Sequence, residues 1–204
     1  MSQAERNAPT TADVVTAAEG AARQIAGLTA LSAAASLYGP AATCRCAPGD
    51  NLALHLLLSS ARAGSVLVCD AGGRRDAGHF GELMAIDAAN HGVRGLVIDG
   101  SVRDGAALLQ LGFPVFHRGL APAPCAKSDA PSIGEPVELG GVPVLPGDQI
   151  VADCDAVLVV PRDIWPDVEV AARRLVAREA DIRTALSEGR RLAELIELPV
   201  EGSS

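Results

Sequence analysis

The sequence predicts a mixed α/β sandwich, and three features of the chain indicate this fold class. Short apolar strands alternate with helical stretches through residues 41–116, a series of short strands with turns fills 137–160, and a long amphipathic helix follows over 163–186. Alternating strands and helices are typical of helices packed on a sheet. The strand-rich second half favours a mixed sandwich over a uniform doubly wound fold.

Composition limits the class of protein. The 204 residues are enough for one domain with a substantial core, and 49% of them are hydrophobic but only 2% aromatic, so the core must be aliphatic. Lys and Arg number 17 against 25 Asp and Glu, which gives a net charge of −8. Nonspecific nucleic-acid binding needs a basic surface, so we expect no nucleic-acid partner.

The cysteines and the N-terminus predict a cytoplasmic protein. Five cysteines is an odd number, and Cys44 and Cys46, two apart on an apparent strand, have no second pair that would complete a zinc site. We therefore expect reduced, buried thiols. The polar N-terminus has no apolar signal core, and no apolar run reaches about 18 residues, so we expect neither secretion nor a membrane span.

In the first half, element ends follow from caps and breakers. We expect a disordered tail over 1–11, one domain over 12–188 and a C-terminal extension over 189–204. Thr10 or Thr11 can cap a first helix over 12–27. An Ala-rich piece of ambiguous structure follows and ends at Gly39-Pro40. Asp50 can cap a second helix over 51–62. Turn residues bound further elements. These are strands 41–46, 66–69, 96–98 and 115–116, a turn at 70–73, a polar loop over 74–80, and helices 81–90 and 105–111.

In the second half, Pro and Gly separate the elements. Residues 121–136 are rich in Pro and Ser and indicate a loop. Four short strands are then expected. They cover 137–139, 142–145, 149–152 and 156–160. Pro166 suits the first turn of the final helix, whose apolar face includes Val168, Ala172, Leu175 and Ile182.

Two segments that follow apolar strands carry the candidate chemistry. At Gly81 a helix begins, so the amides of Glu82, Leu83 and Met84 lack helical partners and can hold a carboxylate. Twenty intervening residues separate Glu82 from the pair Arg103-Asp104. The Asp104 carboxylate suits Mg²⁺ or Mn²⁺, and the guanidinium suits a carboxylate or an enolate oxygen.

Simpler interpretations exist for each segment. Glu82 can merely favour the positive end of a helix dipole, and Asp104 can be a helix cap with Arg103 in a surface ion pair. Because both segments lie at the carboxyl ends of strands, where α/β folds bind ligands, their combination favours a site. His79 is a further pocket candidate, whereas Ser101 has no evident catalytic partners.

The ordered blocks of residues 40–185 resemble the RraA-like family, which includes class II 4-hydroxy-4-methyl-2-oxoglutarate/4-carboxy-4-hydroxy-2-oxoadipate aldolases. The matching blocks are Gly49-Asp50-Asn51, 81–85, 92–104, 112–116, Gly140-Gly141-Val142, Pro146-Gly147-Asp148 and Ala152-Asp153. The resemblance implies a three-layer β/β/α sandwich related to swivelling phosphohistidine domains. It also implies homotrimers or homohexamers with active sites between subunits.

Carried onto this chain, the resemblance implies a metal-dependent pyruvate aldolase that can also decarboxylate oxaloacetate. Asp104 is then the direct ligand of Mg²⁺ or Mn²⁺, Arg103 binds the oxo acid and its enolate, and Glu82 holds metal-bound water. Gly81 and the amides near Leu83 and Met84 hold a carboxylate. Glu82 stands where Asp is common in the family. The alternative implied by the ribonuclease E inhibitor branch is a non-enzymatic, protein-binding regulator.

Overall fold

The computed structural model describes residues 8–196, and its centre is a ten-stranded mixed sheet. The main path runs β1-β12-β11-β3-β4-β5-β6-β2, with β7 beside β5 and β8 beside β3. The strands are β1 (Arg23–Gln24), β2 (Thr29–Ala30), β3 (Leu37–Arg45), β4 (Val66–Gly78), β5 (Gly95–Val102), β6 (Val115–His117), β7 (Gly119–Leu120), β8 (Ser132–Ile133), β11 (Gln149–Ala152) and β12 (Val157–Val160). A separate hairpin joins β9 (Val137–Leu139) to β10 (Val142–Val144).

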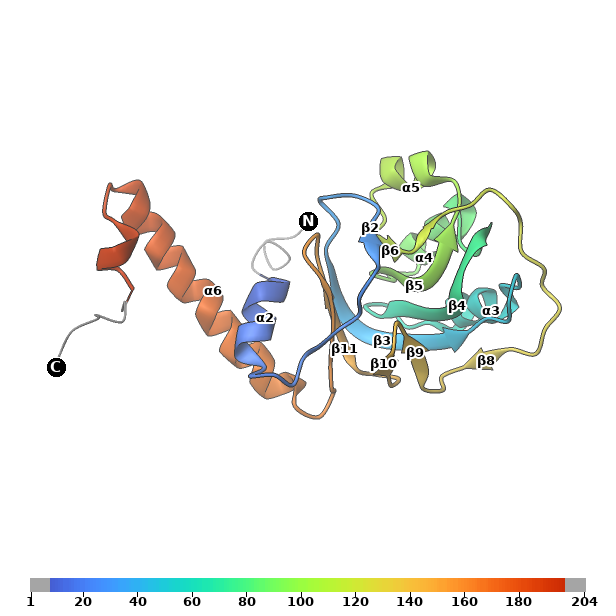
Figure 1. Cartoon of the computed structure of the whole chain (residues 1–204), viewed down its shortest axis with the longest axis horizontal. Coiled ribbons are helices and arrows are strands. Elements are labelled where there is room, and N and C mark those ends of the chain that lie inside the picture. Colours follow the sequence, from blue (N-terminus) through green and yellow to red (C-terminus); the bar gives the residue numbers. More distant parts are fainter. Residues whose placement is uncertain (1–7, 197–204) are drawn as a thin grey trace.

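Different elements cover the two faces of the sheet, because side chains alternate along each strand. One set of strand residues packs against α3 (Leu52–Ser60) and α4 (Glu82–Asn90), and α5 (Gly105–Leu111) adds Leu108 to this core. The opposite set packs against the β9–β10 hairpin. Figure 1 shows α4 and α5 on one side of β4 and β5, with the hairpin on the other. The chain is therefore a mixed α/β protein, as predicted.

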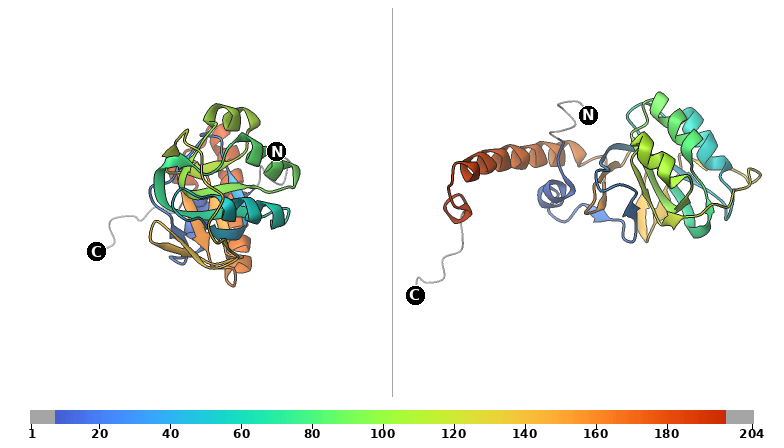
Figure 2. Two further views of the ribbon diagram at one scale, coloured as in Figure 1. Left: turned by 90° about the vertical axis from the view of Figure 1, so that its right-hand side faces the viewer. Right: turned by 90° about the horizontal axis from the view of Figure 1, so that it is seen from above.

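A third cluster fixes the long C-terminal helix. It joins α2 (Thr11–Ala17), β11 and β12 to the first turns of α6 (Trp165–Ser187), where Val168 and Ala172 are buried. The rest of α6 extends away from the sheet and leads to the short helix η1 (Leu192–Glu194), as the view from above shows (Figure 2). No helix of the described part is long and apolar enough to span a membrane.

One expected end in the N-terminal region is wrong. The first helix does not reach residue 27, because Glu19 and Gly20 adopt positive φ and turn the chain toward β1. It begins at Thr11 behind a capping box of Thr10 and Asp13, so the described chain is already ordered within the expected tail. Residues 1–7 of that tail and 197–204 of the C-terminal extension lie outside the described range.

Gly39-Pro40 is also not a break. Strand β3 runs through it, since pairing with β4 begins only at Ala41 and Pro40 needs no amide on that side. A Cβ on Gly39 would collide with the carbonyl of Gly64, so glycine permits this close approach.

The third correction concerns residues 70–78, which were expected to form a turn and a loop. They continue β4, and its pairing with β5 is irregular between Asp70 and Arg74 and again between Arg74 and Gly78. Gly72 and Gly73, both at positive φ, supply this irregularity. Strand β5 likewise continues past Ile98 to Val102, and all eight of its residues are buried. Both long strands reach the candidate residues directly.

Candidate functional site

The two candidate segments meet at one edge of the sheet. Strands β4 and β5 are parallel neighbours, so the turns that follow them lie together. One turn leads through Gly81 into α4, and the other leads through Arg103 and Asp104 into α5. The Arg103 amide donates to the carbonyl of Phe80 at 2.9 Å, which joins the two turns. This is the edge at which open α/β sheets bind ligands.

Helix α4 directs free amides toward this edge. Its hydrogen-bond ladder begins with the Ala85 amide, which donates to the Gly81 carbonyl at 3.1 Å. The amides of Glu82, Leu83 and Met84 therefore lie outside the ladder. The Glu82 amide donates to Oδ2 of Asp104 at 3.3 Å. An anionic group is thus already held at the positive end of α4.

Asp104 has an uncommon backbone conformation. Its φ of 58° is in the left-handed region, which among the described non-glycine residues only Glu19 shares. Asp104 occupies the N-cap position of α5, yet its side chain caps nothing there and reaches toward α4 instead. Asp tolerates this conformation better than most residues, at a cost of roughly 1 kcal/mol or more. The simple capping interpretation of Asp104 is therefore wrong.

Arg103 stands beside the carboxylate. Its Nε lies 3.6 Å from Oδ2 of Asp104, and the two side chains are 42% and 45% exposed. Both line a pocket of about 260 Å³ together with Leu120, Ala121 and Pro122. The guanidinium and the carboxylate therefore both face space that a small molecule can enter.

Glycine allows this close packing. A Cβ on Gly81 would overlap Oδ2 of Asp104 and contact the Arg103 side chain, and one on Gly78 would lie 2.7 Å from Cβ of Arg103. At these positions any side chain would displace the candidate residues.

The other residues that the sequence suggested differ in their exposure and in their position relative to the pocket. Glu82 is exposed beside the pair, whereas Met84 is buried in the core and offers the site only its amide. Leu83 is 78% exposed. His79 is fully buried and is not among the residues lining the pocket; its Nδ1 lies 3.3 Å from the Ser101 carbonyl.

Leu120, Ala121 and Pro122 were not predicted as site residues. Leu120 belongs to the short strand β7, and Ala121 and Pro122 come directly after it. Strand β7 pairs with Ser101 and Val102 at the carboxyl end of β5. Leu120 is an exposed leucine in a two-residue strand, and no motif accompanies it. Only the pairing with β5 reveals its place.

The donors present suit a hydrated divalent ion. Mg²⁺ keeps several waters and is often bound by one or two carboxylates. Asp104 offers a half-exposed carboxylate beside open space, and Glu82 a second, exposed carboxylate nearby. The adjacent guanidinium offers the paired donors that bind a carboxylate or an enolate.

Fold and geometry together define an α/β protein with a candidate small-molecule site at the carboxyl ends of two parallel strands. The family model for RraA-like proteins, described as Aldolase/RraA, matches residues 9–159. The chain therefore belongs to the RraA-like aldolase family.

Three relatives illustrate the match. A protein of Halalkalibacterium halodurans named "Putative 4-hydroxy-4-methyl-2-oxoglutarate aldolase" is 35% identical over 195 residues, covering 92% of each chain. An uncharacterized protein structure from Pseudomonas syringae pv. tomato superposes with a TM-score of 0.78 at 25% identity, again covering 92% of each chain. RraAS2 of Streptomyces coelicolor, described as an unusual member of the RNase ES inhibitor RraA protein family, has a TM-score of 0.70 at 29% identity, covering 89% of this chain and 91% of its own.

Proposed function

We propose that this protein is a divalent-metal-dependent pyruvate aldolase, which cleaves 4-hydroxy-2-oxo acids of the 4-hydroxy-4-methyl-2-oxoglutarate type. The observation that carries the proposal is the adjacency of Asp104 and Arg103 at the positive end of α4. A carboxylate and a guanidinium on one pocket, beside the N-terminus of α4 with its amides, supply the separate contacts that a metal and an oxo acid need.

Each group then has one task. Asp104 would hold Mg²⁺ or Mn²⁺, and the bound ion would supply Lewis-acid stabilisation of the negative charge that develops on the substrate oxygen. Arg103 donates to the 2-oxo group and its enolate, and the amides of Leu83 and Met84 hold a substrate carboxylate. Glu82 orients the water that removes the proton of the 4-hydroxyl. The C3–C4 bond then breaks, and protonation of C3 completes pyruvate.

Oxaloacetate decarboxylation uses the same enolate. Its C3–C4 bond breaks with release of CO₂ in place of a carbonyl compound, and the electron pair again passes to the 2-oxo oxygen that Arg103 faces. No additional residue is required. We therefore propose oxaloacetate decarboxylation as a second reaction of this site.

The test is pyruvate release from 4-hydroxy-4-methyl-2-oxoglutarate and from oxaloacetate. Chelator-stripped protein is assayed before and after Mg²⁺ or Mn²⁺ is added, beside Asp104→Ala and the control Asp181→Ala, which removes an exposed carboxylate of α6. We expect metal-restored turnover in the wild type and the control and none in Asp104→Ala. Equal rates in Asp104→Ala, or turnover without metal, would contradict the assignment.

A protein-binding regulator is the second candidate function, and the description of the Streptomyces coelicolor relative favours it. Leu83 and Leu120, which are 78% and 58% exposed, offer apolar contacts near the site. Inhibition of ribonuclease E by the wild type, lost in a Leu83→Glu variant, would support this function. A regulatory function would explain a result in which the folded protein turns over neither substrate.

We further propose that this fold is a three-layer β/β/α sandwich related to swivelling phosphohistidine domains. We also propose that the protein is a homotrimer or a homohexamer. The apolar face of α6 supports self-association, because beyond Ala172 its residues are only partly buried within one chain. An oligomer that covers this face would explain why a 23-residue helix extends from the body of the protein.

A further inference from the structure

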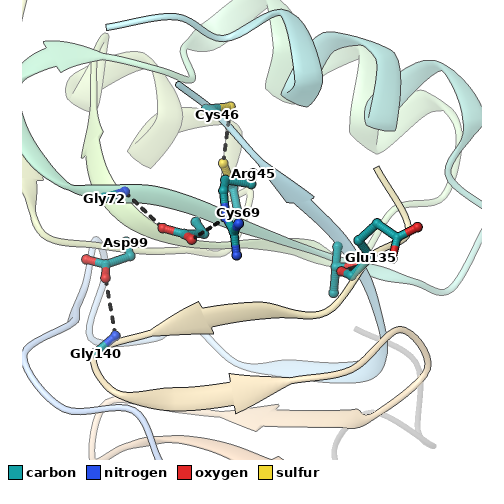
Figure 3. Close-up of polar contacts among 9 residues, drawn as sticks. Arg45, Cys46, Cys69, Gly72, Asp99, Glu135 and Gly140 are labelled. Atoms are coloured by element: carbon teal, nitrogen blue, oxygen red, sulfur yellow. Dashed lines mark hydrogen bonds and ion pairs between the residues drawn. The ribbon is translucent and has the colours of Figure 1, made fainter. Parts of the chain in front are cut away.

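Three cysteines from neighbouring strands gather in the core. Cys44 lies on β3 opposite Cys69 of β4, and Cys46 follows just past the end of β3, on the same side as Cys44. The three sulfur atoms all lie within 4.8 Å of one another. Sγ of Cys46 is 3.5 Å from Sγ of Cys69, and Figure 3 shows these two side chains pointing toward each other.

The spacing suits a single metal ion. Three sulfurs that each lie about 2.3 Å from one ion are separated by roughly 3.8–4.0 Å, whether the geometry is tetrahedral or trigonal. The observed cluster needs only small side-chain adjustments to reach that spacing. All three thiols are free, so none is already committed to a disulfide.

The surroundings favour a soft ion with three ligands. Cys44, Cys46 and Cys69 are 1%, 5% and 0% exposed and pack among apolar residues beneath α3. Among residues 8–196, no fourth His, Cys, Asp or Glu joins the group. Zinc in structural sites is almost always four-coordinate, whereas thiolates select copper(I) among the soft cations.

A backbone donor also faces the cluster. The Leu54 amide is in the first turn of α3, outside its ladder, where an unpaired donor can face an anion. The Cys46 sulfur shares hydrogen bonds with Cys44 and Cys69 and accepts a further one from this amide.

We propose that Cys44, Cys46 and Cys69 bind one copper(I) ion through three thiolate sulfurs. Binding forms three Cu–S bonds, breaks the three S–H bonds and releases the three protons to solvent, while copper stays in the +1 state and no electron is transferred. Hydrogen bonds between thiols are replaced by bonds to the ion. The site shares no residue with Arg103 and Asp104 and does not depend on the proposed aldolase activity.

The test begins from a variant without the other thiols, Cys125→Ser with Cys154→Ser, which leaves only the cluster. Reduced protein competes anaerobically with the bicinchoninate complex of copper(I). We expect one ion per chain, with thiolate-to-copper absorption in the near ultraviolet. Adding Cys69→Ser should weaken binding by more than roughly 100-fold, since loss of even an outer-shell partner costs about 10–100-fold.

X-ray absorption on copper-loaded wild-type protein provides a test that needs no cluster variant, and three sulfur neighbours are expected. Asp104→Ala should bind copper(I) as the wild type does, so failure of this site and failure of the proposed function can be told apart. The proposal is overturned by absence of binding to folded, reduced protein, by unchanged affinity in Cys69→Ser, or by preferential four-coordinate zinc binding.

Discussion

Gly81 and Asp104 are matched in shape at the scale of single residues. The Asp104 carboxylate occupies the volume that a side chain at position 81 would need. Gly81→Ala should therefore displace the carboxylate from the positive end of α4 and lower kcat/KM by about 100-fold, since small misplacements at a reacting centre have effects of this size.

Gly105→Ala is the comparison variant, because the atoms nearest to its Cβ are at the end of the exposed Leu120 side chain, which lines the same pocket but can move. Circular dichroism checks that both variants fold. Full activity in folded Gly81→Ala would show that the position of Asp104 is not critical.

Arg103 provides a second test at this scale. The Arg103→Lys variant would keep the positive charge of the arginine but would lose its planar pair of donors. We expect kcat/KM for pyruvate release to fall by roughly 100-fold, the effect of losing one well-placed donor to a developing oxyanion. Steady-state kinetics on both substrates measure this, with Arg174→Lys on α6 as the control. An unchanged kcat/KM would remove Arg103 from the reaction.

Sequence reasoning placed the candidate residues at one edge of the sheet because their positions follow from local order. An apolar strand followed by a polar pair indicates a turn at the carboxyl edge of the sheet, and β5 with Arg103-Asp104 follows this rule. The sequence could not place Cys69 beside Cys44, because the 24 residues between them give no sign of the strand register. Long-range pairing is the information that composition and spacing lack.

At the scale of elements, Asp50 connects α3 to the loop before β8. Its Oδ1 accepts from the Leu52 amide, and its Oδ2 accepts from the amides of Ser128 and Asp129 at 2.6 and 3.2 Å. Burial alone would raise the pKa of Asp50, but these hydrogen bonds hold it below its ordinary value. The carboxylate therefore stabilises the folded chain only while it is ionised.

Asp50→Asn should lower the free energy of unfolding by about 1–3 kcal/mol at neutral pH, since buried amides lose a charged acceptor. Because the folded pKa is depressed, the difference between wild type and variant should be full above about pH 5 and shrink below about pH 4. Urea titrations at several pH values measure this, with exposed Asp163→Asn as the control. A pH-independent difference would contradict the role assigned to the charge.

The errors in element ends share a physical cause. Residues 70–73 and the pair at 39–40 have the composition of turns, but strand neighbours decide their conformation. Glycine at positive φ serves an irregular strand as well as a turn, and proline is tolerated where pairing is one-sided. Helices α4 and α5 were predicted correctly because their ends depend on adjacent residues, including Gly112 at the end of α5.

At the scale of the whole molecule, packing of the sheet against the elements on its two faces explains the arrangement of residues up to Val160. Packing explains the position of only the first half of α6. Its first turns pack on α2 and the sheet, and Trp165 meets Tyr38 edge to face at 5.5 Å. The helix spans 23 residues, roughly 35 Å at 1.5 Å per residue. The apolar face that begins with Val168 and Ala172 forms a stripe that continues through Leu175, Ile182 and Leu186. Leu186 is 38% exposed.

This stripe predicts how the protein assembles. Leu175→Lys with Ile182→Lys places two charges on the apolar face, and charges excluded from water are strongly unfavourable. We expect the wild type to sediment as a trimer or hexamer and the double variant as a monomer, measured by analytical ultracentrifugation. Val170→Lys with Ala177→Lys is the matched control, since it places the same charges seven residues apart on an exposed face. A monomeric wild type, or an intact assembly in the Leu175 and Ile182 variant, would show that α6 does not join subunits.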